Sequence, residues 1–333
     1  MILAADIGGT SSRLAVFDVK AGQLRSVVQE RYPSAGHRRL EEIVHAFQST
    51  HGLRIDHACF AVAGPVIGGR SDAPNLPWSI DASLLAREIG LASIGLLNDL
   101  EANAFGIAEL GPEDFEILNV GSTNAAGNQV VISAGTGLGV AGLYWDGQNH
   151  HPFATENGHT DFAPNNELEI ELLQHLRAKY GHVSWERVIS GPGLVDIYEF
   201  LRDTRRGSEP PWLRDAFSTE DPAAVISRAA QDGSSEICRH ALDVFTSVYG
   251  AEAGNVALGV MATGGVYVGG GIAPKIIDTL KGGIFMEAFR AKGRLRGLLE
   301  AMPVRVILND LTALLGAARW AARRSTLTGS ARA

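Results

Sequence analysis

The chain has 333 residues, with 29 Lys and Arg against 37 Asp and Glu, so its formal net charge is −8. Hydrophobic residues make up 45% and charged residues 20%, which excludes a disordered chain and predicts about two folded domains. With this negative charge and no basic stripe, nucleic acid is not expected as a partner. The two cysteines, Cys59 and Cys238, form no CxxC pair, which excludes a zinc-thiolate site.

The first third of the chain is expected to alternate between strands and helices. Apolar runs broken by glycine predict strands, and apolar residues at helical spacing predict helices. The expected elements are a strand, glycine turn and strand over 1–18, a helix over 40–47, a strand over 58–63, a helix from an N-cap at Asp81 to Ile89, a strand over 94–97 and a helix over 101–110.

The remainder repeats this alternation. The expected elements are strands over 130–134 and 140–145, a helix over 166–180 with a capping box, a helix opened by Asp221-Pro222, a long helix over 234–262, a strand over 266–268, a strand over 304–308 and a helix over 311–323. When Asp18 is aligned with Asp146, the two strand–turn–strand hairpins overlay with an offset of 128 residues. This weak internal similarity suggests a duplicated unit.

Alternating strands and helices predict an α/β fold with two halves. We expect a small α/β domain over 1–109, completed by a C-terminal helix over 305–333, and a large α/β domain over 110–304. The cleft between the halves is the expected ligand site.

One uncharged stretch, residues 253–274, imitates a membrane span. It contains seven glycines, however, so a buried helix followed by a glycine-rich strand and loop is the better interpretation. The apolar run after Met1 is too short for a signal peptide, and a cytoplasmic protein with no membrane partner is expected.

Two glycine-rich turns are candidate phosphate sites. Residues 6–10, Asp-Ile-Gly-Gly-Thr, combine backbone N–H groups, a hydroxyl and a carboxylate able to hold a divalent cation through water. The alternative is a tight hairpin with an exposed Asp. Residues 135–139, Gly-Thr-Gly-Leu-Gly, match neither a P-loop nor a dinucleotide fingerprint. Two such turns at matching places in two halves are able to grip one polyphosphate from both sides.

Asn98-Asp99 follows an apolar strand, at the position where functional side chains often project. A carboxylate there is able to accept the proton of a hydroxyl that attacks phosphorus. The alternative is a helix cap for the segment that follows.

A third polar cluster lies after the second pair of strands. Glu156 and His159 offer an acceptor and a donor suited to vicinal sugar hydroxyls, while a metal site that includes Asp161 is the rival interpretation. Glu186 fits either a helix-start partner or a hydroxyl acceptor. His150 and His151 are expected in a solvated turn.

These motifs together resemble the bacterial hexokinase-type glucokinases over nearly the whole chain. The matching runs are 6–10, 97–99, 134–139, 156–159, 190–194, 264–267 and 269–272. That family has the actin-like ATPase fold, two duplicated ribonuclease H-like halves with a cleft between them. The resemblance therefore implies the same fold here, in agreement with the repeat.

The resemblance also implies an activity: in-line, ATP-dependent phosphorylation of D-glucose at its 6-hydroxyl, with Asp99 as general base. The residues implied to bind the sugar are Asn75, Asn98, Asp99, Gly137, Glu156, His159 and Glu186. Those implied to bind ATP are Asp6, Gly8, Gly9, Thr10, Gly135, Thr136, Gly137, Gly265, Gly270 and Gly271. Asp6 is further implied to hold Mg2+, and a homodimer is expected because such families are commonly dimeric.

Two departures from the family pattern bear on the substrate. Family members usually carry glycine where this chain has Asn157, and threonine where it has Pro74. Either change is able to shift the sugar preference, so a kinase for another hexose stays open. A non-catalytic sugar sensor is the alternative from a different class.

Overall fold

The computed structural model describes residues 1–72, 76 and 78–330. The chain divides into two compact units, Met1–Glu113 with Asn309–Ala333 and Asp114–Leu308. The expected boundaries, after 109 and after 304, lie four residues before the observed ones. The second unit opens with strand β8 (Phe115–Asn119) and ends with strand β13 (Val304–Ile307), and these two strands pair with each other.

The first unit is built on a five-stranded sheet. Its order is β3 (Gln23–Pro33), β2 (Ser11–Lys20), β1 (Ile2–Ile7), β4 (His57–Val62) and β7 (Gly95–Asn98). The pairs β3–β2 and β2–β1 are antiparallel, whereas the pairs β1–β4 and β4–β7 are parallel. A separate two-stranded ribbon joins β5 (Arg70–Ser71) to β6 (Ile80–Asp81).

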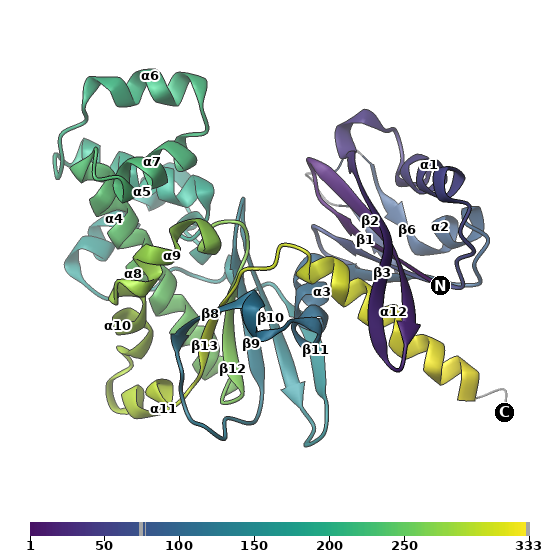
Figure 1. Ribbon diagram of the computed structural model, residues 1–333. Helices are drawn as coiled ribbons and strands as arrows, with labels where there is room; N and C mark the ends of the chain where they lie inside the picture. The colour runs from purple at the N-terminus through teal and green to yellow at the C-terminus, as the bar shows by residue number, and fades with distance from the viewer. Residues whose placement is uncertain (73–75, 77, 331–333) are drawn as a thin grey trace. The chain divides into compact units, whose positions relative to one another are not determined.

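Helices cover both faces of this sheet, because successive side chains of a strand point to opposite faces. Leu3, Ala5 and Ile7 of β1 pack in one core with α1 (Leu40–His51) and α2 (Ala82–Glu88). Ile2 and Ala4 pack in the other with α3 (Asp99–Gly106) and α12 (Thr312–Ser330), which Figure 1 draws in yellow. Asp6 has the same parity as Ile2 and Ala4 and therefore lies on the α12 side.

The second unit contains a six-stranded sheet. Its order is β11 (His150–Thr155), β10 (Leu138–Trp145), β9 (Gln129–Ala134), β12 (Gly265–Gly269), β13 and β8. Strands β9 to β13 have the same order and directions as the five strands of the first unit, with β8 added antiparallel to β13. The hairpin β1–β2 thus corresponds to β9–β10, as the sequence overlay predicts.

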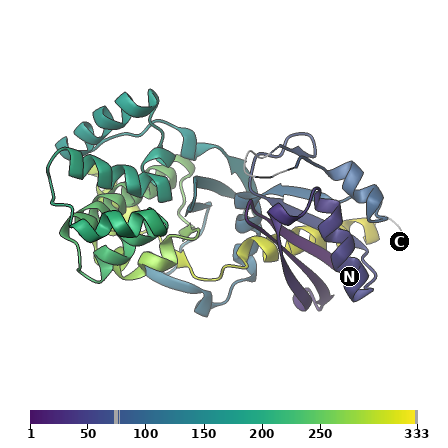
Figure 2. The ribbon, with the colours of Figure 1, turned by 90° about the horizontal axis from the view of Figure 1, so that it is seen from above.

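Most of the helices belong to the second unit and form the green bundle of Figures 1 and 2. They are α4 (Glu167–Tyr180), α5 (Gly191–Asp203), α6 (Pro211–Thr219), α7 (Pro222–Gln231), α8 (Glu236–Val260), α9 (Ile277–Lys281), α10 (Ile284–Arg290) and α11 (Arg296–Glu300). Helix α8 packs against α5, α7 and α10 and is the centre of the apolar core.

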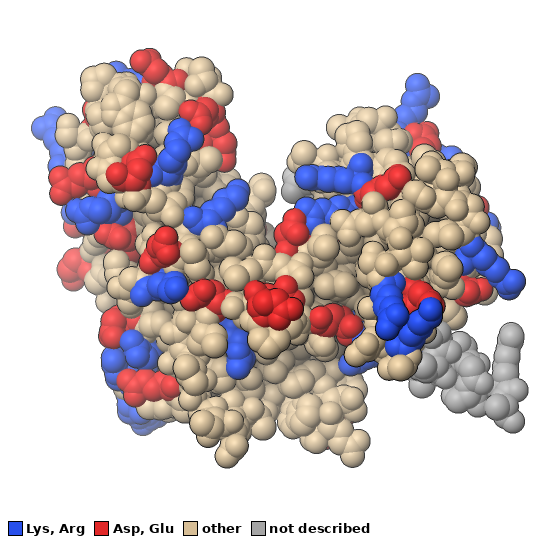
Figure 3. Space-filling model, in the orientation of Figure 1, with Lys and Arg blue, Asp and Glu red and all other residues tan. Residues whose placement is uncertain are grey.

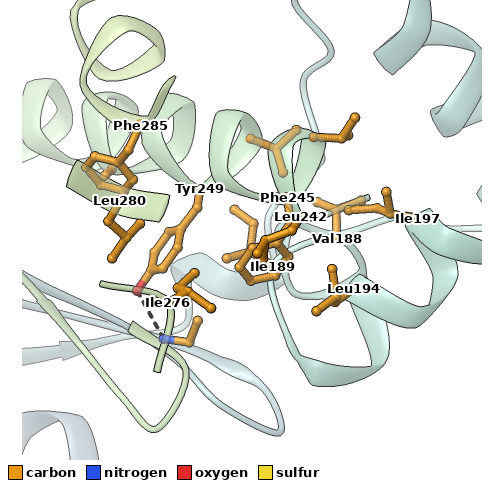
Figure 4. Packing of buried hydrophobic residues seen from close by; sticks show 14 of the residues in the cluster. Val188, Ile189, Leu194, Ile197, Leu242, Phe245, Tyr249, Ile276, Leu280 and Phe285 are labelled. Carbon is orange, nitrogen blue, oxygen red and sulfur yellow. Dashed lines mark hydrogen bonds between the residues drawn. The ribbon is translucent and has the colours of Figure 1, made fainter. Parts of the chain in front are cut away.

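Tyr249 connects α8 to the sheet. Figure 4 shows its ring among buried apolar residues, with the hydroxyl accepting a bond from the backbone N–H of Ala134 at 3.3 Å. The helix thereby supports the end of β9, where a glycine turn begins. The uncharged stretch 253–274 forms the last turns of α8 and strand β12. Within the described residues, no helix is long and apolar enough to cross a membrane.

Local capping signals are confirmed. Asp81 accepts bonds from the N–H groups of Ser83 and Leu84, and Asn166 and Glu169 form the expected box at the start of α4. The expected solvated turn at residues 150–151 is wrong, because these residues begin the edge strand β11. No residue of β11 is buried, so the strand lacks the alternation of apolar and polar residues that would have marked it. On the face drawn in Figure 3, basic and acidic side chains are interspersed over both units.

Candidate functional site

The candidate residues of the first unit meet at one edge of its sheet. The parallel strands β1, β4 and β7 end in register, with Ile7 beside Val62 and Val62 beside Asn98. Two hydrogen bonds continue the pairing past the strand ends. The N–H of Ala63 donates to the Ile7 carbonyl at 3.1 Å, and Asn98 Nδ2 donates to the Gly64 carbonyl at 3.0 Å. The turn at 8–10 and the Asn98-Asp99 pair therefore project from the same edge.

The first glycine turn is held in place by a buried serine. Ser34 donates through Oγ to the Gly8 carbonyl at 2.6 Å and through its N–H to the Thr10 carbonyl at 3.1 Å. Its hydroxyl also pairs with that of Ser12 at 3.0 Å. The turn is thus preorganised, with Thr10 exposed at its tip. No sequence signal marks Ser34, since it acts across 26 residues.

Asp6 is at the centre of a small charged group. Burial raises the pKa of its carboxyl, Arg13 opposes this shift and Asp310 adds to it. Arg13 faces Asp6 across the hairpin and donates to Asp310, to Oδ2 at 2.6 Å and to the backbone carbonyl at 3.0 Å. A carboxylate in such a site is stabilised by an approaching cation.

Asn98 is the N-cap of α3. Its Oδ1 accepts bonds from the N–H groups of Leu100 at 2.9 Å and Glu101 at 3.4 Å, so the cap interpretation is correct for this residue. Asp99 is the first residue of the helix, where the positive end of the helix dipole favours a negative charge. It is half-buried, and its Oδ1 accepts from the N–H of Leu100 at 3.0 Å. Asn75 lies outside the described residues.

In the second unit, the turn after β9 contacts Glu186. This glutamate lies in η5 (Trp185–Arg187), and its Oε2 accepts from the N–H of Leu138 at 3.0 Å. A Cβ at Gly137 would overlap the same carboxylate, so only glycine allows this approach. The N–H of Gly191 donates to the Gly135 carbonyl at 2.8 Å and ties the turn to the start of α5.

The polar cluster after β11 joins this turn. His159, in η4 (Asn157–His159), lies with Nε2 3.9 Å from Glu156 Oε2 and Nδ1 4.0 Å from Glu186 Oε1. The side chains of Glu156, His159 and Glu186 are 68%, 60% and 31% exposed, so they are open to a ligand. Glu186 thus links the glycine turn at 135–139 to the loop at 156–159.

The rival metal interpretation needs Asp161 in this cluster. Asp161 instead pairs with His182, its Oδ1 lying 2.7 Å from Nε2. Within the described residues, no group of three or more His, Cys, Asp or Glu side chains is arranged to hold a metal ion.

A large cavity of about 1310 Å³ opens beside the same turn, within the second unit. Three of the predicted ATP-binding residues line it, namely Gly135, Thr136 and Gly271. Its other walls come from the end of α4, the N-terminal part of α5, the length of α7 and η6 (Ala273–Ile276). Gln231 and Lys275 line it as well, although no motif pointed to either.

The predicted glycines Gly265 and Gly270 lie at opposite ends of β12. Gly270, with φ +84°, follows the strand and packs against the backbone of Ala134, close to the turn. Gly265 begins the strand and pairs with Gln129 at the start of β9, and it does not line the cavity. Gly265 therefore lies at the opposite end of β12 from the turn, and its role in ATP binding stays a prediction.

Comparison with known proteins gives consistent results. The family model described as Glucokinase matches residues 3–324. A glucokinase from a Nostoc species is 40% identical over 97% of this chain and 99% of that protein. The crystal structure of a glucokinase from an Antarctic psychrotroph is 31% identical, with a TM-score of 0.85 over 97% of this chain and 98% of that one. A ROK family glucokinase from Streptomyces griseus, solved with glucose and AMPPNP, shares the fold at 22% identity and a TM-score of 0.63, over 97% of this chain and 99% of that one.

Proposed function

Because this chain belongs to the glucokinase family and is an ATP-dependent glucose kinase, we propose that its two glycine turns, Asp99 and the cluster around His159 carry out that reaction. The observation that carries the proposal is the convergence of Glu156, His159 and Glu186 on Gly137. These groups come from two separate segments of the chain and offer the acceptors and donors that vicinal hydroxyls require.

We also infer that each unit is one half of an actin-like duplication. The shared order and directions of five strands in each sheet support this inference, as does the equivalence of the hairpins β1–β2 and β9–β10.

The nucleotide is proposed to occupy the cavity of the second unit. Its volume of about 1310 Å³ is ample for a nucleotide, and the turn at 135–137 forms part of its wall. The adenosine would lie among residues of α5, α7 and η6, and the phosphates would bind the backbone N–H groups and hydroxyl of the turn. The turn at 8–10 would bind phosphate oxygens in the same way.

Mg2+ is proposed to bind at Asp6. A single carboxylate suits this ion, which keeps several waters and takes its other ligands from substrate phosphates. The site fits, since the Asp6 carboxylate is largely buried next to the phosphate turn and its ionised form gains from a nearby cation. When bound, the ion neutralises charge on the β- and γ-phosphates.

Glucose is proposed to bind Glu156, His159 and Glu186 through its hydroxyls, while Asp99 accepts the proton of the 6-hydroxyl as that oxygen attacks the γ-phosphorus. Asn98 assists in two ways. Its cap fixes the start of α3 and hence the position of Asp99, and its NH2 group has a second donor beyond the bond to Gly64.

The test is an ADP-release assay with glucose and a panel of other hexoses at fixed ATP. We expect release that depends on the sugar, with the highest kcat/KM for glucose. Faster turnover of another hexose would change the substrate. Glucose binding without any ADP release would instead indicate a sensor. The homodimer and the cytoplasmic location stay predictions.

A further inference from the structure

A buried carboxyl group lies beneath the loop that carries Glu156 and His159. Glu252, on α8, is 1% exposed. Its Oε1 accepts a hydrogen bond from Asn157 Nδ2 at 2.6 Å, and its Oε2 accepts one from Asn255 Nδ2 at 3.0 Å. Because Asn157 lies between the two proposed sugar ligands, Glu252 anchors the segment that presents them.

On its other side the loop is held against strand β10. Gly158 is buried so close to the Leu138 carbonyl that a Cβ would overlap it, and Thr155 Oγ1 donates to the Val140 carbonyl at 2.8 Å. Toward α8, by contrast, there is a cavity of about 290 Å³, lined in part by Asn157, Glu252 and Asn255. On this side the bond from Asn157 to Glu252 spans from the loop to the helix.

The electrostatic surroundings make Glu252 costly to keep ionised. Burial raises the pKa of its carboxyl to about 7, while the two amides and the charge of Lys292 oppose the shift. Lys292, from the turn after α10, donates to the Ala251 carbonyl at 2.9 Å. Burial lowers the pKa of Lys292, and the charges of Glu252 and of Glu169 in α4 oppose that shift. The other residues that line the cavity are uncharged. Burying an ionised carboxyl group costs free energy, so packing of the core does not explain a glutamate at this position.

We propose that Glu252 is a positioning residue for glucose, which holds Asn157 and thereby sets the geometry of Glu156 and His159. This inference rests on the proposed function. An ionised carboxyl accepts both amide bonds, whereas protonation turns one oxygen into a donor and leaves it a weaker acceptor. The loop is therefore anchored best when Glu252 is ionised, and glucose affinity depends on that ionisation.

The test compares wild type with Glu252→Gln, Asn157→Ala, the double variant and Asn255→Ala as a matched control. The glucose KM, the ATP KM and kcat are measured from pH 6 to pH 8. At pH 8 we expect Glu252→Gln and Asn157→Ala each to raise the glucose KM about threefold to tenfold, and the double variant no further, because the two residues act as one unit. The ATP KM and kcat stay within about twofold, and Asn255→Ala, which keeps the bond to the loop, changes the glucose KM less than twofold.

The pH profile separates positioning from a merely structural role. The glucose KM of wild type should rise toward that of Glu252→Gln as the pH falls from 8 to 6, while the difference between the two vanishes. A glucose KM in Glu252→Gln and Asn157→Ala equal to wild type at every pH would overturn the inference, as would additive effects in the double variant. Wild type that releases no ADP with glucose would overturn the proposed function itself.

Discussion

The hairpins β1–β2 and β9–β10 occupy the same place in two equivalent sheets but carry different chemistry. When the last residues of β1 and β9 are aligned, Asp6 corresponds to Ser133, Gly8 to Gly135 and Gly9 to Thr136, an offset of 127 residues in place of the 128 of the sequence overlay. The first hairpin surrounds its turn with charge, from Asp6 and from the Arg13–Asp310 pair. The second has no charge of its own at these positions.

The comparison of the two hairpins distinguishes phosphate binding by backbone N–H groups from the charged contacts that side chains provide. Glycine turns in both hairpins can present N–H groups to phosphate, so that ability follows from the shared topology. Asp6, the proposed partner of a cation, lies in the first hairpin, and its counterpart in the second hairpin is the uncharged Ser133. The second turn instead receives Glu186 from a later segment, and the absence of a Cβ at Gly137 is what allows this contact.

The largest effect in this comparison should come from Asp6→Asn. Loss of the carboxylate removes the proposed partner of Mg2+, and we expect turnover to fall roughly 10²-fold, with a higher requirement for free Mg2+. The matched change in the other hairpin is Ser133→Ala. Ser133 Oγ is buried and has no hydrogen-bond partner within the described residues, so its removal should leave kcat and both KM values within about twofold of wild type. Steady-state kinetics over a Mg2+ titration measures both, and equal losses would mean that the hairpins share one role.

A smaller effect is expected from Gly137→Ala. The added Cβ overlaps the Glu186 carboxylate and displaces it, so the glucose KM should rise on the order of tenfold. Gly297→Ala is the control, because a Cβ there meets no atom within 4 Å. Kinetics with glucose as the varied substrate distinguishes the two variants. An unchanged glucose KM in Gly137→Ala would remove Glu186 from the sugar site.

The smallest expected effect is on stability, and it depends on pH. The pKa of Glu252 is about 7 in the folded protein against 4.5 for the ordinary side chain. A raised folded pKa means that the contribution to stability is present below pH 4.5 and is lost as pH rises through about 7. Glu252→Gln removes this dependence, so its free energy of unfolding relative to wild type should be higher at pH 8 than at pH 5, by about 1–3 kcal/mol. Urea unfolding at both pH values measures this difference, and a difference of the opposite sign would contradict the assigned pKa shift.

Sequence reasoning succeeded where the cause of structure is local. The caps at Asp81 and Asn166 were predictable because each binds N–H groups within three residues of itself. The sequence did not show that Gly265 and Gly270 lie at opposite ends of β12, since glycines at both ends of a short strand do not reveal which end faces a ligand. Ser34 and Glu252 were not found at all, because each acts on a segment distant along the chain.

The most direct test of the account is the transfer step at Asp99. Asp99→Asn keeps the size of the side chain but removes the proton acceptor, so kcat should fall roughly 10²–10⁴-fold. Calorimetry on the same variant should give a glucose Kd close to that of wild type, because the binding groups remain. A variant with near-normal kcat would contradict the assignment of Asp99 as the base. A variant that loses glucose binding together with kcat would make Asp99 a binding residue instead.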